Sequence, residues 1–145
     1  MNWQKEAIAD LRCYRSRKMS IESMTERLKA LEDKFGAIRC ATTDSPPVMG
    51  GASRLEDNLI NNIVERQRIG LNIDATRRLV ELTEKGLEAL SNNQRTVLDK
   101  FFVSRTDGYL EWLMENFHME KSRIYELKDE ALYSFTIGMY GVIDY

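Results

Sequence analysis

The chain has 145 residues, of which 43% are hydrophobic and 30% charged, a composition typical of a folded, helix-rich protein rather than a disordered one. Lys and Arg number 21 against 23 Asp and Glu, so the net charge of −2 offers no global basic footprint for nucleic acid. With 8 Gly and 2 Pro the sequence disfavours a turn-rich β-sandwich or barrel, and no apolar run approaches the roughly 18 residues that span a membrane.

The residues before a predicted loop at 39–53 are expected to form a long helix with a narrow apolar stripe that runs from Ala7 to Ile38. Successive members of the stripe are three or four residues apart, and the polar Lys18 occupies one of these positions. The register of the stripe slips between Ile21 and Met24. Its apolar members are Ala7, Leu11, Tyr14, Ile21, Met24, Leu28, Leu31, Phe35 and Ile38.

A loop is predicted over residues 39–53, because both prolines and two adjacent glycines fall there. A second helix is expected to start at a capping box formed by Ser53 and Glu56 and to end at Gly86, with Leu87 folding back. Its stripe is Leu55, Leu59, Asn62, Arg66, Ile69, Ile73, Thr76, Val80, Thr83 and Leu87.

Two helices joined by one loop should pack as an antiparallel hairpin, which defines a first region, residues 1–89. The core of such a hairpin is thin, so we expect it to need a further partner, either the C-terminal segment or a second subunit. The region is therefore predicted to carry oligomerisation.

Residues 90–145 are predicted to form a trihelical helix-turn-helix domain, which makes the whole chain all-α. Ser91 and Gln94 form a capping box before one helix, Ser104–Gly108 is a loop by composition, and a short helix ends near Phe117. A turn of about four residues then leads into a helix starting near Lys121. The apolar tail after Phe135 is expected to fold back on the hairpin or on this domain, and Trp112 to serve packing.

In a helix-turn-helix the second helix enters the major groove with its N-terminal residues on base edges. The sequence places Lys121, Ser122, Arg123 and Tyr125 there as base-reading candidates. Arg95, Lys100, Arg105 and Lys128 are the candidates for phosphate contacts. Residues 120–135 carry a net charge of −1, from three basic and four acidic side chains, which disfavours phosphate attraction by this helix alone.

The segment Leu90–Val103 (LSNNQRTVLDKFFV) resembles the opening helix of sigma-factor region-four domains. A resemblance to phage ArpU/RinA-type transcriptional regulators rests on residues 113–117, Met119, Ile124, Tyr125, Leu127 and 130–132. The likeness covers residues 90 to 135. It implies a phage or prophage activator of late genes that binds double-stranded promoter DNA in the cytoplasm of a bacterial host and meets RNA polymerase.

Two other functions stay open at this level. One is a protein-interaction adaptor that docks RNA polymerase or another regulator without touching DNA. The other is a small terminase-like packaging subunit, which also combines a helix-turn-helix with oligomerisation helices. DNA binding by a homo-oligomer, with heads about 34 Å apart on half-sites, is the preferred hypothesis.

Catalytic and metal-binding patterns are missing from the sequence. Cys13, Cys40 and His118 are too few for a structural zinc site, and there is no Gly-rich phosphate loop. We therefore expect no enzyme, no metal and no cofactor, and both cysteines to be buried and inert. Met1–Glu6 lack the apolar segment of a secretory signal, which favours a cytoplasmic protein without a membrane span.

Overall fold

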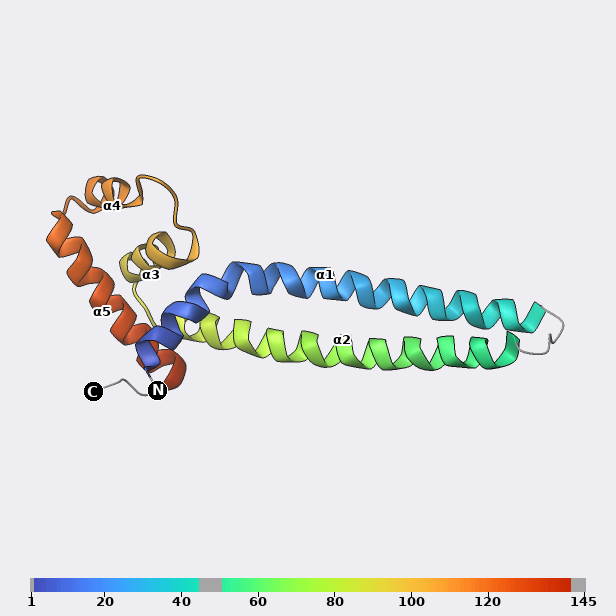
Figure 1. Cartoon of the computed structure of the whole chain (residues 1–145). Helices are drawn as coiled ribbons and strands as arrows, with labels where there is room; N and C mark the ends of the chain where they lie inside the picture. The colour runs from blue at the N-terminus through green and yellow to red at the C-terminus, as the bar shows by residue number, and fades with distance from the viewer. Residues whose placement is uncertain (1, 45–50, 142–145) are drawn as a thin grey trace. The chain divides into compact units, whose positions relative to one another are not determined.

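The computed structural model describes the backbone of residues 2–44 and 51–141, and the side chains of residues 2–40 and 54–141. Its elements are α1 (Trp3–Asp44), α2 (Gly51–Glu88), α3 (Asn92–Leu98), a π-helical segment η1 (Asp99–Val103), α4 (Tyr109–Phe117) and α5 (Lys121–Tyr140) (Figure 1). No strand occurs in the described ranges, so the expected all-α class is confirmed. None of these helices is long and apolar enough to cross a membrane.

The chain divides into two compact units. One contains the residues up to Lys18 together with those from Arg78 onward, and the other contains Met19–Arg77. The first unit is larger than the domain expected over residues 90–145, because the first turns of α1 and the last turns of α2 pack into its core. We call it the head unit, and Met19–Arg77 the arm unit.

In the arm unit α1 and α2 lie side by side and antiparallel (Figure 1). Arg27 pairs with Glu65 at 3.3 Å, and the Asn62 side-chain amide donates to the Leu31 carbonyl at 2.9 Å. The predicted stripes face one another: every stripe residue of α2 is buried or half-buried. Asn62 and Arg66, the two polar members, are held by a hydrogen bond to each other.

The loop between these helices is shorter than expected. α1 continues to Asp44 and α2 begins at Gly51, because residues 40–44 contain neither Gly nor Pro and nothing in them interrupts the helical hydrogen bonds. Ser53 therefore lies inside α2, so its expected role as the N-cap is wrong. The rest of the predicted loop, residues 45–50, lies outside the described residues.

The head unit has two hydrophobic clusters. The first joins α1 to the C-terminal helix and comprises Ala7, Leu11, Leu90, Leu98, Ala131, Leu132, Phe135 and Met139. The second lies under the α4–α5 corner and comprises Val97, Phe101, Leu113, Ile124 and Leu127. Burial of Phe135 and Met139 shows that the apolar tail packs back on the protein as far as α5 is described.

Gly86 does not end α2, contrary to the sequence prediction. The helix continues to Glu88, and positive φ values occur only at Gly108, His118 and Gly141 among the described residues. Gly86 instead gives α5 room to approach: a Cβ on it would lie 2.8 Å from the Phe135 ring. Gly138 of α5 meets the same backbone, with its own hypothetical Cβ 3.4 Å from the Gly86 Cα.

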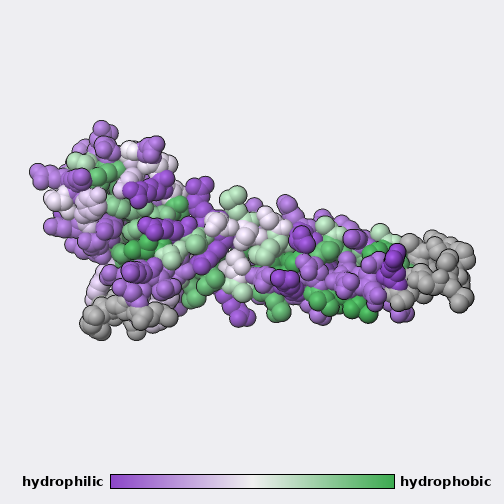
Figure 2. All heavy atoms as spheres, viewed as in Figure 1, coloured by the Kyte–Doolittle hydropathy of each residue, from purple (hydrophilic) through white to green (hydrophobic). Residues whose placement is uncertain are grey.

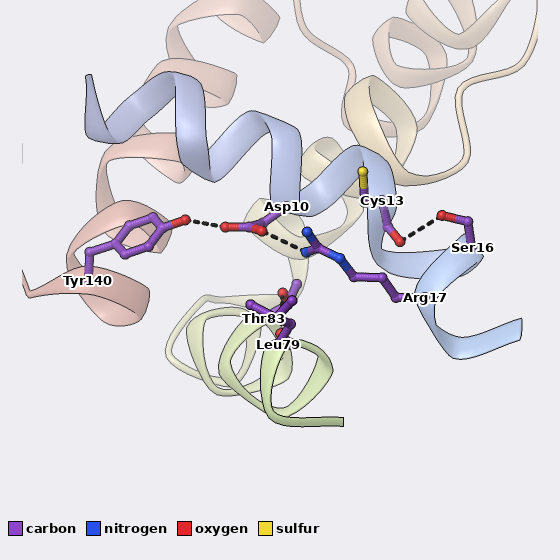
Figure 3. A network of polar contacts seen from close by, with 7 residues as sticks. All are labelled: Asp10, Cys13, Ser16, Arg17, Leu79, Thr83 and Tyr140. Atoms are coloured by element: carbon purple, nitrogen blue, oxygen red, sulfur yellow. Dashed lines mark hydrogen bonds and ion pairs between the residues drawn. The ribbon is translucent and has the colours of Figure 1, made fainter. Parts of the chain in front are cut away.

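A polar network ties α1 to the end of α5 (Figure 3). Asp10, which is buried, accepts hydrogen bonds from the Tyr140 hydroxyl and from Arg17, whose Nη1 is 2.6 Å from Oδ1. Arg17 is half-buried for this reason, while Lys18, expected to fill one position of the α1 stripe, is exposed and pairs with Glu84 of α2 at 3.9 Å. Burial of both cysteines was also a wrong expectation, since Cys13 and Cys40 are exposed.

Candidate nucleic-acid interface

The segment predicted to read DNA begins at a confirmed capping box. The Ser91 hydroxyl accepts from the Gln94 backbone N–H at 3.3 Å, and the Gln94 side chain accepts from the Ser91 N–H at 3.2 Å. Arg95 donates two hydrogen bonds to the Leu90 carbonyl, at 3.0 and 3.1 Å. Arg95 therefore stabilises the connection between α2 and α3, although its side chain remains exposed.

Residues 118–120 form the connection between α4 and α5, and its length agrees with the short turn predicted from the sequence. α4 ends at Phe117 and α5 begins at Lys121, with His118 between them in the left-handed conformation (φ 52°, ψ 45°). Histidine tolerates positive φ better than bulky residues do. Glu120 is the N-cap of α5 and makes no side-chain capping bond, so the first backbone N–H groups of the helix receive no help from it.

α5 separates buried from exposed residues in its first turns. Ile124 and Leu127 are buried against α3, η1 and α4 and fix the helix in place. The four predicted base-reading residues are all exposed, and the structure brings them together on the outer surface of the leading turns: Lys121, Ser122, Arg123 and Tyr125. The backbone corner and this exposure match the prediction.

An aromatic and basic cluster connects this surface to η1 and α4. The Phe101 ring contacts Tyr109 and Tyr125 edge-on, with centroid distances of 5.1 and 5.7 Å. Arg105 lies over the Tyr109 ring at 4.7 Å, and Lys128 lies 5.7 Å from the centre of the Tyr125 ring. Two predicted phosphate contacts, Arg105 and Lys128, thus belong to one cluster with the base-reading candidate Tyr125.

Lys100, the fourth predicted phosphate contact, lies apart from this network, with its ammonium 4.4 Å from the centre of the Trp112 ring. Trp112 is 41% exposed, so the packing predicted for it takes place at the surface, against Lys100. Sequence reasoning also missed Phe101 and Tyr109 as supports of the site. Their spacing marks them as apolar helix positions, and only the packing of three helices shows that their rings meet.

Charge on the reading surface is partly neutralised within α5. The Arg123 guanidinium lies 3.0 Å from Glu126 and 3.5 Å from Glu130, and the hydrogen bond to Glu126 with the charge of Glu130 raises its pKa above the ordinary value. The Lys128 ammonium is 2.7 Å from Asp129. Lys121 and Ser122 have no polar side-chain partner among the described residues.

The site has no features of a metal centre: no three His, Cys, Asp or Glu side chains converge in the ranges that the structure describes. His118 serves the backbone corner instead. Comparison of the chain with family models, curated proteins and solved structures finds no match.

Proposed function

We propose that the protein binds double-stranded DNA through the leading turns of α5 and regulates transcription, in the manner of the phage late-gene regulators that residues 90–135 resemble. One observation carries the proposal. α5 starts directly after a left-handed corner and is fixed by the buried Ile124 and Leu127. At its N-terminus Lys121 and Ser122 are exposed and have no polar side-chain partner within the part of the chain that the structure describes. A duplex is the partner to which such an edge is suited.

The surface offers groups for both parts of DNA recognition, which are contact with phosphates and contact with base edges. The N-terminus of α5 has the positive end of the helix dipole, which attracts phosphate, and Lys121 adds a full charge there. Ser122 and Tyr125 can donate and accept hydrogen bonds at base edges, and Arg123 can donate two parallel bonds to guanine. Arg105 and Lys128, held by their aromatic neighbours, then serve as phosphate contacts on either side.

Arg123 must exchange partners for this to happen. In the free protein it is paired with Glu126 and Glu130, so a base edge has to replace two carboxylates. This exchange, together with the net charge of −3 over residues 91–145, implies weak binding by one head unit to arbitrary DNA.

The experiment is selection of bound fragments from a random DNA pool, followed by fluorescence anisotropy titration of the selected duplex. Arg123→Glu should weaken binding by about tenfold or more, because a guanine contact is lost and a repulsive charge gained. Glu126→Gln should strengthen binding, because it releases Arg123 and removes a negative charge from the surface. Lys29→Glu, an exposed change in the arm unit, is the matched control and should leave affinity unchanged.

Absence of affinity even at low salt, with helical content intact by circular dichroism, would contradict the proposal. That result would favour the second candidate, a protein-interaction adaptor. A specific observation supports it: Glu126, Asp129 and Glu130 are all exposed on α5, an acidic surface suited to a basic protein partner such as a face of RNA polymerase.

A further inference from the structure

The arm unit exposes a row of large aliphatic side chains on the side of α2 that faces away from α1. Ile60 is 57% exposed, Val64 55% and Leu71 71%. Residues four and seven apart lie on one side of an α-helix, and the row is offset by two positions from the buried stripe of Asn62 and Ile73. Figure 2 shows hydrophobic atoms along the edge of the arm unit where Figure 1 places α2. Scattered exposed apolar residues are ordinary, whereas an aligned row indicates a contact surface.

The core of the arm unit is also incomplete. No side chain of α1 between Met19 and Cys40 is fully buried, although six apolar stripe residues lie there. Two helices alone cannot surround their common seam, and bundles close it with further helices. The arm unit is therefore an open pair of helices, and the row on the far side of α2 is a second uncovered apolar surface over the same length.

The exposed charges along α2 indicate which partner suits the exposed row. Among the exposed residues of 54–65, Arg54 stands against Glu56 and Asp57, which gives a net charge of 1 − 2 = −1, since Glu65 is half-buried and pairs with Arg27 of α1. Among the exposed residues of 66–77, Arg68 and Arg77 stand against Asp74, which gives 2 − 1 = +1, since Arg66 is half-buried and bonded to Asn62. An antiparallel copy of the same segment places the acidic half of each chain beside the basic half of the other, whereas a parallel copy would place like charges together.

We propose that the exposed row of α2 is a self-association surface, on which the arm unit of a second copy of this chain packs antiparallel to form a dimer. Ile60, Val64 and Leu71 form the apolar centre of the contact, and the opposite charges of the two halves of the segment set its direction. A twofold dimer of this kind uses one surface of each copy for the same contact. The proposal does not depend on the proposed function, because its residues lie on the arm unit and not on α5.

Sedimentation equilibrium on the full chain tests the surface. The chain should sediment at twice its mass of 16.9 kDa at micromolar concentration. Val64→Lys with Leu71→Lys should weaken association by about tenfold or more, since two charges enter an apolar contact. Met19→Lys, at an equally exposed apolar position on α1, should leave it unchanged. A monomer, a ring of three or more chains, or a dimer that the double variant does not weaken overturns the proposal.

Charge reversal tests the antiparallel direction. Glu56→Lys with Asp57→Lys places two basic halves together and should dissociate the dimer. Adding Arg68→Glu and Arg77→Glu to the same chain reverses both halves and should restore it. Failure of the fourfold variant to reassociate, with helical content intact by circular dichroism, overturns antiparallel pairing. Affinity of each variant for the selected DNA duplex is measured in parallel, so failure of DNA binding is distinguished from failure of self-association.

Discussion

Replacing Gly86 by Ala should destabilise the protein, although Ala is the better helix former. The new Cβ would lie 2.8 and 3.0 Å from two carbons of the Phe135 ring and 3.4 Å from the Met139 Cβ. Phe135 is fully buried, so the ring cannot move without displacing its neighbours. Overpacking of this kind costs about 1–3 kcal/mol, while the change from Gly to Ala in a helix contributes about 1 kcal/mol. The expected net loss of unfolding free energy is therefore about 1 kcal/mol.

Gly70→Ala is the matched control, since Gly70 lies in the same helix and nothing described lies within 4 Å of its hypothetical Cβ. It should gain about 1 kcal/mol. Urea unfolding followed by circular dichroism, at one protein concentration, measures both. The two substitutions should differ in sign, and equal stabilisation by both would refute the assigned close contact of α2 with α5. Adding Phe135→Leu to Gly86→Ala should recover part of the loss, because the ring that meets the Cβ is removed.

Two further outcomes follow from local features of the head unit. Burial and the hydrogen bond to Glu84 raise the pKa of Tyr14 to about 12, and burial with the hydrogen bond to Asp10 raises the pKa of Tyr140. The unfolded chain loses these protons near pH 10, so stability should be intact below that pH and fall from pH 10 upward as the folded pKa values are approached. Thermal unfolding against pH measures this, and Tyr14→Phe with Tyr140→Phe should flatten the decline; an unchanged slope would refute the assigned hydrogen bonds. At the α4–α5 corner, His118→Gly should keep stability within about 1 kcal/mol, whereas His118→Val should lose more, because a β-branched residue is strained at positive φ. Equal melting temperatures for these two variants would show that the corner does not need a left-handed residue.

Sequence alone determined the features that depend on a few neighbouring residues. The stripe of α2 from Leu55 to Leu87 follows from helical periodicity, and the start of α3 follows from the reciprocal bonds of Ser91 and Gln94. The corner at His118 and the start of α5 at Lys121 also follow from local backbone preferences. The exposure of the four base-reading candidates also follows from the sequence, because the helical periodicity that buries Ile124 and Leu127 places the other residues of the first turns on the exposed side of α5.

Tertiary structure decided the features that depend on residues far apart in the chain. Glycine is typical of a helix C-terminus, which is why the sequence predicted an end at Gly86. Phe135, 49 positions later, packs against Gly86 instead, and the missing side chain leaves room for its ring. Asp10 and Tyr140 meet only because α1 packs on α5, and Arg17 pairs with the same carboxylate. Phe101 connects Tyr109 to Tyr125 because η1, α4 and α5 converge on one ring. Helical periodicity predicts which residues are buried, whereas the packing of whole helices determines which partner each buried residue contacts.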